Sequence, residues 1–360
     1  MKLAIATLLL VPALPFMLTV RHVPDAVAKS HGRHVASAAG AVGTDSVRID
    51  EWTVPWEKSR PRDPHVDPQG RVWFVGQVGN YIARLDPATG KFTRFEVDPG
   101  THPHNLVVAR DGMVWYTGNQ NGMIGRLDPA TFRITRFPMP DPSVRDPHTM
   151  IFDAKGDAWF TAQGANYVGR LRPATGKVEL VKVETPRARP YGIVVDAKGT
   201  PWFVQFGTNV VASIDPATMK VREYRLPDPG ARPRRIAVTP DGMVWWGDYT
   251  RGMLGRLDPA TGAMREWPLP SGTRSFPYAM TSDDQGRVWL VETGVRPNRL
   301  VGFDPATGKV FANEPIAGSG AGTVRHMTFD ARTGMIWFGT DENTIGRAKV
   351  RQERVAVRSE

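Results

Sequence analysis

Apolar and polar residues alternate along most of this chain in short runs, and turn residues interrupt the runs every few positions. A typical stretch covers residues 104–109, turns at Asp111-Gly112, continues over residues 113–117 and turns again at Asp128-Pro129. Alternation with a period of two predicts half-buried β-strands. Asp-Gly and Asp-Pro favour turns, because glycine accepts a positive φ and proline fixes φ. The pattern therefore predicts an all-β protein built from short antiparallel strands.

The strand pattern itself recurs, and tryptophan marks each copy. Seven tryptophans follow one another at intervals of 42 to 48 residues. They are Trp73, Trp115, Trp159, Trp202, Trp245, Trp289 and Trp337. A period of about 40 to 50 residues made of four strands is typical of a β-propeller, in which each repeat forms one blade. We therefore predict seven four-stranded blades, with the tryptophans packed between neighbouring blades.

The last repeat lacks its outer strand, and the beginning of the domain supplies a candidate for it. No copy of the outer strand follows Trp337, whereas residues 49–55 resemble that strand. We expect this N-terminal strand to complete blade seven, so that residues 47–350 form one closed ring. Closure would remove exposed sheet edges, which otherwise pair with other chains.

The segments outside the predicted ring suggest export. Residues 3–20 are apolar and follow Lys2, and Ala26-Val27-Ala28 offers a cleavage site. We predict a signal peptide at residues 1–28, a linker at 29–46 and a tail at 351–360, with an uncleaved anchor as the alternative. The mature protein would then be periplasmic or secreted, without stable membrane insertion. The absence of cysteine excludes disulfides, thiolate catalysis and cysteine metal sites.

The chain has a net charge of +10, but its positive residues are dispersed. No run of five like charges occurs, so we expect no nucleic-acid partner, and we expect a monomer. Five arginines occupy one repeated place on the third strand of their blades, where a structural ion pair in each blade is the better explanation. They are Arg84, Arg126, Arg170, Arg256 and Arg347.

Candidate functional residues lie where the repeats differ. In a propeller the innermost strands line a central channel, and the loops at their starts form a rim where side chains from every blade meet. The position eleven residues before the tryptophan gives His104, His148, Tyr191, Arg234, Tyr278 and His326, and a gapped alignment adds His65 from blade one. Acidic residues follow three of the tryptophans closely: Asp248, Glu292 and Asp341. Neutral imidazoles beside carboxylates can hold a metal or accept a proton, although a polar channel mouth without chemistry has the same composition.

Several phrases of the repeat resemble one known family. Pro190-Tyr191-Gly192-Ile193, Trp159-Phe160-Thr161 and Asn166-Tyr167-Val168-Gly169-Arg170 are similar to the streptogramin B lyase (virginiamycin B lyase) family, as is Glu266-Trp267-Pro268-Leu269-Pro270. The resemblance covers residues 47–350. It implies a lyase that linearises a cyclic depsipeptide by Mg²⁺-assisted β-elimination at its ester bond.

The resemblance also assigns roles to residues of blade seven. It implies that His326 is the general base and that Asp341 helps to hold Mg²⁺. The chain departs from the family at three places. Val324 stands where the family has a second metal-binding glutamate, Arg325 where it has proline, and Tyr278 where it has a histidine that contacts the substrate.

Three functions remain open from the sequence. The first is a carbon–oxygen lyase for a cyclic ester or an anionic small molecule, in which His326 is the base. Its electrophile would be Mg²⁺ on Asp341 and Glu292 or, without a metal, Arg325 or Arg234. The expected substrate-binding residues are Tyr278, Arg234, Arg325, His65, His104, His148, Tyr191 and Asp248. The other two functions are a metal-dependent lactonase and a non-catalytic periplasmic binding or scaffold propeller.

Overall fold

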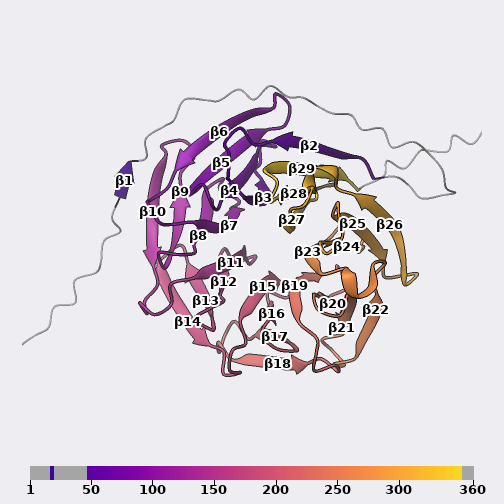
Figure 1. Ribbon diagram of the computed structural model, residues 1–360. Helices are drawn as coiled ribbons and strands as arrows, with labels where there is room; N and C mark the ends of the chain where they lie inside the picture. Colours follow the sequence, from indigo (N-terminus) through magenta and orange to yellow (C-terminus); the bar gives the residue numbers. More distant parts are fainter. Residues whose placement is uncertain (1–16, 20–46, 351–360) are drawn as a thin grey trace, which may run out of the picture.

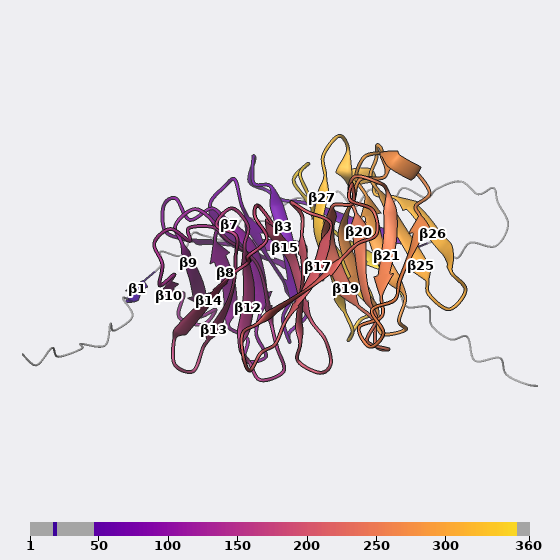
Figure 2. The same cartoon turned by 90° about the horizontal axis from the view of Figure 1, so that it is seen from below.

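The computed structural model describes residues 17–19 and 47–350, and in this part of the chain seven sheets surround a common axis (Figure 1). Each sheet is one blade whose strands are antiparallel and follow the chain from the axis outward. Seen from the side, the blades form a disc with strands running between its two faces (Figure 2). The predicted all-β seven-bladed propeller is confirmed.

The strand boundaries follow the turn residues of the sequence. Blade one contains β3 (Pro61–Val66), β4 (Val72–Gly76), β5 (Tyr81–Asp86) and β6 (Lys91–Glu96). Blade two contains β7 (Pro103–Val108), β8 (Val114–Gly118), β9 (Met123–Leu127) and β10 (Arg133–Pro138). Blade three contains β11 (Pro147–Phe152), β12 (Ala158–Ala162), β13 (Tyr167–Arg172) and β14 (Lys177–Lys182). Blade four contains β15 (Pro190–Val195), β16 (Pro201–Gln205), β17 (Val210–Ile214) and β18 (Val221–Arg225).

The remaining blades repeat the same order. Blade five contains β19 (Pro233–Val238), β20 (Val244–Asp248), β21 (Met253–Leu257) and β22 (Met264–Pro268). Blade six contains β23 (Pro277–Ser282), β24 (Val288–Glu292), β25 (Arg299–Asp304) and β26 (Lys309–Pro315). Blade seven contains β27 (Val324–Asp330), β28 (Met335–Thr340), β29 (Thr344–Lys349) and the N-terminal β2 (Ile49–Thr53). Short 3₁₀ turns precede β23 and β27.

The ring closes through β2, as the sequence predicts. This strand pairs antiparallel with β29 from Ile49 opposite Ala348 to Thr53 opposite Thr344. Arg347 on β29 donates a 3.0 Å hydrogen bond to Asp50. Trp52 stacks on Trp337, with 5.6 Å between the ring centroids. The two ends of the propeller domain, β2 and β29, therefore share one blade (Figure 1).

The repeated tryptophans pack between neighbouring blades, and five of them also make one polar contact within their own blade. All seven are at most 3% exposed. A buried indole N–H needs an acceptor, and in four blades the carboxylate six residues earlier accepts it; the pairs are Trp73–Asp67, Trp159–Asp153, Trp202–Asp196 and Trp289–Asp283. Trp245 uses Thr239 instead. The tryptophans are scaffold residues rather than a binding platform.

The repeated arginines of the third strand lie opposite these tryptophans. The guanidinium of Arg170 is 5.0 Å from the ring centroid of Trp159, and the other four lie 5.3 to 5.9 Å from theirs. Such a cation above an aromatic face is attracted by the ring quadrupole. Arg170 also pairs with Glu179, and Arg347 with Asp50. Stacking on tryptophan is thus the contact that all five blades share, and the expected ion pair accompanies it in these two blades.

The predicted signal peptide, linker and tail lie outside the described residues, apart from β1 (Met17–Thr19), a short strand paired with β10. No helix in the described part of the chain is both long enough and apolar enough to cross a membrane.

Replacing Trp52 by alanine tests the closure of the ring. Loss of the half-buried indole should lower the free energy of unfolding by about 2 kcal/mol, a partial large-to-small penalty. Urea unfolding of the variant and of wild type measures the difference. The exposed Arg48→Ala, on the same segment, should change stability by less than about 0.5 kcal/mol. Equal stabilities for the two variants would show that β2 does not close the ring in solution.

Candidate functional site

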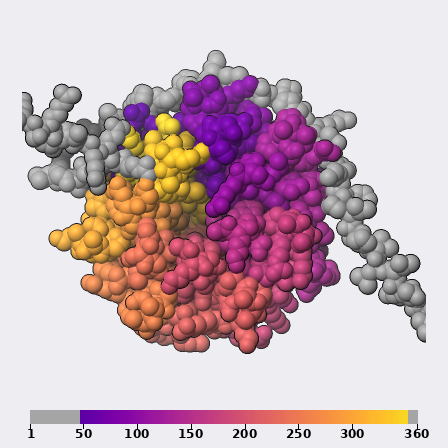
Figure 3. Space-filling view, turned by 180° about the vertical axis from the view of Figure 1, so that it is seen from behind, coloured from indigo at the N-terminus to yellow at the C-terminus, as the bar shows by residue number. Residues whose placement is uncertain are grey.

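One face of the disc carries both sets of loops that surround the channel mouth. The loops that enter the innermost strands lie beside the loops that connect the second and third strands, and backbone hydrogen bonds join them. Examples are Gln77 N to Arg60 O, 3.3 Å, and Gly207 N to Ala188 O, 2.9 Å. The seven blades meet around the centre of the disc, as the space-filling view of one face shows (Figure 3). The predicted rim is therefore present.

The innermost strands present two rows of residues to the channel. In each of them the pairing register breaks near the start of the strand. Such a bulge re-aims side chains, and residues of both rows make contacts across the channel. In each blade one residue of the innermost strand pairs with the blade tryptophan, and the residue three positions before it belongs to the first row. This row, called here the inner ring, comprises Arg62, His104, His148, Tyr191, Arg234, Tyr278 and Arg325. The second row follows it by one residue and includes Asp63, Asn105, Thr149, Arg235 and His326.

Two residues of the inner ring differ from the prediction. In blade one His65 pairs with Trp73, so Arg62, eleven residues before that tryptophan, takes the place expected for His65. No alignment gap is needed there. In blade seven Thr328 pairs with Trp337, which puts Arg325 in the ring and His326 in the second row. The turn between β27 and β28 is one residue longer than its counterpart in blade two, and this moves the register. The inner ring therefore has three arginines and two histidines instead of four histidines.

The second row ties the blades together across the channel. Asp63 is fully buried, and its carboxylate accepts two hydrogen bonds, one from Arg62 Nε at 3.3 Å and one from Asn105 Nδ2 at 2.8 Å. Arg235 donates to Thr149 Oγ1 of blade three at 3.1 Å and to the carbonyl of Arg325 in blade seven at 3.3 Å. Side chains of blades one, two, three and five thus meet the backbone of blade seven in the channel.

His104 and His148 are buried, and His65 and His326 are half-buried. The rings of His104 and His148 lie against each other with centroids 3.6 Å apart and planes tilted by 37°, and His104 Nδ1 lies 3.1 Å from the His148 carbonyl oxygen. Burial lowers the pKa of both well below the ordinary histidine value. Burial also lowers the pKa of His65 and of His326 to about 4. All four rings are therefore uncharged near neutral pH, and His104 and His148 together form a wall of the channel.

Tyr278 is the titratable group with the most unusual surroundings. It is 2% exposed, and its hydroxyl hydrogen-bonds the Tyr191 hydroxyl. Burial by itself would raise the pKa of Tyr278, but four guanidinium groups oppose this effect and lower the pKa to about 7. They belong to Arg234, Arg62, Arg235 and Arg325. Because the Tyr191 pKa is raised by burial and by the Tyr278 charge, the pair shares one ionisation, and it falls on Tyr278.

Arg234 connects this hydroxyl pair with the mouth of the channel. Its guanidinium carbon lies 3.6 Å from the ring centroid of Tyr278 and 4.3 Å from that of Tyr249. Phe206 lies on another side at 4.7 Å. Phe206 and Tyr249 are half-buried, and Phe276, stacked near Tyr249, is 38% exposed. The mouth thus combines a cation with an accessible aromatic surface.

The three candidate acids are engaged by protein groups. Arg325 donates to both carboxylate oxygens of Asp341, at 2.9 Å and 2.6 Å. Glu292 is fully buried and accepts from Ser271 N at 2.9 Å, from the Ser271 hydroxyl and from Ser275 Oγ at 2.9 Å. Asp248 is likewise buried and accepts from the backbone of Arg232 and the side chain of Arg251. These contacts hold the loops of the rim.

The residues at the expected metal position do not fit Mg²⁺. A magnesium ion needs several oxygen ligands around one point. Within the described ranges no three His, Asp or Glu side chains come together in such a way. The carboxylate of Asp341 faces a guanidinium, and the apolar Val324 occupies the place of the second acid. The guanidinium of Arg325 lies where the resemblance implies a metal cation.

Sequence reasoning missed Asp63, and it named Arg62 and Arg235 only as part of an arginine-rich rim. The spacing of eleven residues from Trp73 already pointed to Arg62. Asp63 gave no separate signal, and the repeat did not place Arg235 in the channel, because a strand of alternating faces does not predict two consecutive channel residues. The register break near the start of each strand supplies the explanation.

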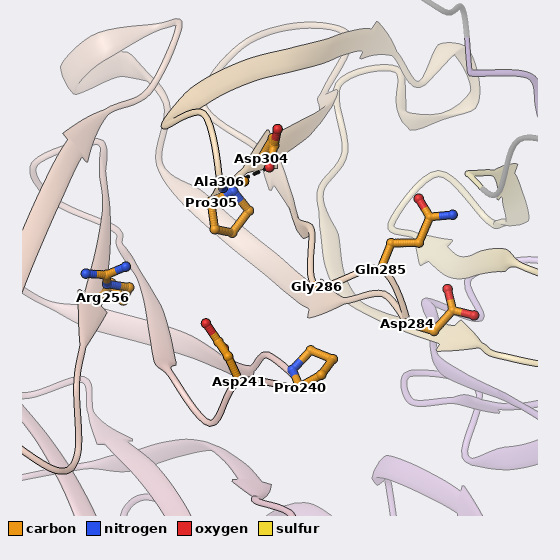
Figure 4. Close-up of a pocket in the computed structure, with 9 residues that line it drawn as sticks. All are labelled: Pro240, Asp241, Arg256, Asp284, Gln285, Gly286, Asp304, Pro305 and Ala306. Atoms are coloured by element: carbon orange, nitrogen blue, oxygen red, sulfur yellow. Dashed lines mark hydrogen bonds between the residues drawn. The ribbon is translucent and has the colours of Figure 1, made fainter.

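A separate cleft lies at the opposite end of blades five and six. Figure 4 shows Asp241, Gln285 and Asp304 among its lining residues, in a space of about 410 Å³. Asp241 and Gln285 belong to the turns between β19 and β20 and between β23 and β24, and Asp304 is the last residue of β25. These turns are at the far ends of the strands from the inner ring, so this cleft is not part of the candidate site.

The fold and the site define a class: a seven-bladed propeller with a polar, arginine-rich channel mouth. Residues 31–300 match the virginiamycin B lyase family, and the chain belongs to that family. The matched segment ends before β27, so His326 and Asp341 lie beyond it. No curated protein matches the chain.

Solved structures show the same fold. Virginiamycin B lyase from Staphylococcus aureus is 22% identical, with a TM-score of 0.77 over 85% of this chain and 100% of that one. The same values hold for a catalytically inactive form of that enzyme with quinupristin. The extracellular domain of a putative hybrid two-component system from B. thetaiotaomicron is 16% identical, with a TM-score of 0.61 over 87% of this chain and 44% of that one. At these identities the likeness concerns the fold alone.

Ionisation of Tyr278 is directly measurable. The ultraviolet difference spectrum of the folded protein should show one phenolate forming with a pKa of about 7. Tyr278→Phe should remove this transition. Arg234→Gln should move it to higher pH, because one stabilising positive charge is lost. Tyr224→Phe, on the outer strand of blade four, should leave it unchanged. A transition that survives in Tyr278→Phe would contradict the assignment.

Because His65 and His326 are neutral in the folded protein, we expect the protein to lose stability in weak acid. The pKa of His65 and of His326 is about 4 in the folded protein, against an ordinary value of 6.5. The unfolded chain therefore binds more protons between these values, and the free energy of unfolding should fall as pH decreases from 6.5 to 4. Urea unfolding along this series measures the slope.

His65→Gln should make the slope shallower, because one of the groups responsible is removed. The exposed Arg110→Gln, in the turn between β7 and β8, should keep it. A full slope in His65→Gln would show that this ring is not buried in its neutral form.

Proposed function

We propose that this protein is a lyase that cleaves a carbon–oxygen bond of an anionic ester by β-elimination, with arginine in place of a metal ion. One observation supports this most: four guanidinium groups act electrostatically on the buried Tyr278 hydroxyl and lower its pKa to about 7. A base with a pKa near the working pH is the most effective one for proton transfer. The site therefore combines a base with a fixed positive field for the charge that develops.

Elimination requires two tasks of these residues. The Tyr278 phenolate removes the proton on the carbon next to the ester or carboxylate carbonyl, and the electron pair moves onto the carbonyl oxygen as an enolate. The enolate then forms a carbon–carbon double bond, and the bond from the β-carbon to the leaving oxygen breaks. The leaving oxygen takes the proton back from Tyr278. No water is consumed.

Arginine is suited to hold the enolate. Donors aimed at the developing charge in a partly dry site lower the barrier more than they would in water. Arg325 is 26% exposed at its side chain, lies 5.8 Å from the Tyr278 ring centroid, and is oriented by Asp341. The guanidinium carbon of Arg234 lies 3.6 Å from the centroid of the same ring. These two residues are the proposed electrophiles.

His326 takes a different part in this proposal from the one implied by family resemblance. It lies in the second row, below the inner ring, and its pKa of about 4 makes it a weak base. Its proximity lowers the pKa of the buried Asp63. We therefore assign His326 to positioning within the channel, and the base to Tyr278. Asp341 positions Arg325, and Glu292 holds the rim.

The substrate in this proposal is a small molecule with an ester and an anionic group. Quinupristin, bound by the inactive Staphylococcus aureus enzyme, supports an ester of a cyclic molecule. Exposed arginines at the rim support the negative charge, among them Arg60, Arg145, Arg189 and Arg274. We also propose that the protein acts outside the cytoplasm, in the periplasm or after secretion, as the apolar segment at residues 3–20 suggests.

A non-catalytic binding propeller is the second candidate. It is favoured by the burial of Tyr278 and Tyr191, at 2% and 4% exposure, which leaves little of the hydroxyl pair accessible to a substrate. A metal-dependent lactonase is not supported by any ligand set in the described part of the chain.

Product mass tests the proposal on the full chain. Quinupristin and carboxylated esters should give products whose masses sum to that of the substrate, without added water, and EDTA should leave the rate unchanged. Arg325→Gln should lower kcat/KM by about 10²-fold, and Tyr278→Phe by at least as much, with loss of the rise through pH 7. Arg110→Gln serves as the charge-matched control.

Each alternative has its own outcome in the same experiment. A gain of one water would indicate hydrolysis, and inhibition by EDTA that Mg²⁺ reverses would indicate a metal-assisted reaction. Binding of the esters without any turnover would establish the binding propeller instead.

A further inference from the structure

Two buried arginines of the channel have nitrogen atoms that the fold leaves without an acceptor. Arg62 is 4% exposed; its Nε and Nη1 donate to Asp63 and Gln77 at 3.3 Å and 3.0 Å. Arg235 is 2% exposed; its Nε and Nη1 donate to the Arg325 carbonyl and Thr149. In each case Nη2 is buried and has no partner among the described residues. A buried donor without an acceptor is destabilising, which suggests that a ligand supplies one.

The charges in the channel do not balance. Arg62, Arg234, Arg235 and Arg325 contribute four positive charges. Asp63 and Asp341 supply two negative ones, and the histidines around them are neutral. Partial ionisation of Tyr278 offsets only part of the remainder. The site therefore has an excess of positive charge that one small anion would neutralise.

We infer that the centre of the channel is a carboxylate-binding site, in which Arg62 and Arg235 hold the anionic group of the substrate through their free Nη2 atoms. A planar guanidinium matches the two oxygens of a carboxylate better than it matches a spherical anion. The flanking walls are flat rings, Tyr191, His104 and His148, which suit an organic acid. Arg234 adds a third donor, because its buried Nε also lacks a partner within residues 47–350.

This site explains how a substrate could be oriented at the Tyr278 hydroxyl. Arg62 and Arg235 both act on that hydroxyl electrostatically, so a carboxylate held between them places its neighbouring carbon near the proposed base. The link to catalysis rests on the proposed function. Anion binding itself does not, and it can be tested without any turnover.

Tyr278 provides the readout for that test. Charged or titratable groups face it from four other strands: Arg62 on β3, Tyr191 on β15, Arg234 and Arg235 on β19, and Arg325 on β27. A bound anion opposes ionisation of the phenol, so it should raise the pKa of Tyr278. Acetate is the probe, titrated into the full chain at constant ionic strength with chloride as the balancing anion. Sulfate is titrated separately.

Acetate should raise the Tyr278 pKa in a saturable manner in wild type. Arg235→Gln and Arg62→Gln should each weaken the apparent affinity for acetate by about tenfold or more, since each removes a charged donor. Arg110→Gln, with the same loss of charge at the far face, should keep the wild-type affinity. Arg62→Gln keeps the test valid if Arg235→Gln does not fold, because Arg235 also links three blades.

The outcomes separate this inference from the proposed function. No acetate effect, or an equal effect in all variants, would overturn the inner site, even if esters are cleaved. A saturable effect of sulfate without one of acetate would overturn the carboxylate assignment in favour of a tetrahedral oxoanion. A saturable acetate effect that both variants weaken supports the site, even if no ester is turned over and the lyase is rejected.

Discussion

The pairing of β2 with β29 is the contact on which the ring depends, because it joins the two ends of the domain within one blade. Without it, blade seven would lack its outer strand, and β29 would expose a row of unpaired backbone groups. Every inner strand is placed by its two neighbours around the ring. The side chains that meet in the channel come from seven blades, and the pairing of β2 with β29 keeps these blades in fixed positions relative to one another. The site is a property of the closed ring and of no single blade.

Closure also explains how the fold tolerates four arginines near one hydroxyl. Gathering like charges away from water is costly unless each finds compensation. Here Asp341 pairs with Arg325, Asp63 pairs with Arg62, and aromatic faces cover Arg234. The rigid packing of buried tryptophans between blades prevents these groups from moving apart. The result is a lasting positive field at one end of the channel.

The architecture could be predicted from sequence because it depends on regular spacing. Seven tryptophans, the Asp-Gly turns and the displaced outer strand at residues 49–55 are each local signals, and the structure agrees with them. The left-handed residues Asn80, Asn166 and Asn343, at φ of 56°, 67° and 66°, follow from the same repeat. Most ring residues, such as Tyr191 and Tyr278, were also found by counting from the tryptophan.

The parts of the site that escaped prediction depend on departures from regular spacing. His65 was placed in the ring by a gap that the chain does not contain, and His326 by a count that ignored one additional turn residue. The second row, with Asp63 and Arg235, arises from a break in the strand register, and no residue type in the sequence predicts this break. The bidentate contact of Arg325 with Asp341 joins residues sixteen positions apart, and only the folded blade shows that the acid faces a cation rather than a metal.

The additional residue in the turn between β27 and β28 has a consequence for how such a channel can change. That turn lies at the opposite face of the disc, yet its length determines whether Arg325 or His326 stands in the inner ring. An insertion or deletion at an exposed turn, where the fold tolerates it well, can thus exchange a guanidinium for an imidazole at the channel mouth. The chemistry of the channel can in this way diverge between relatives while every residue type around it stays the same.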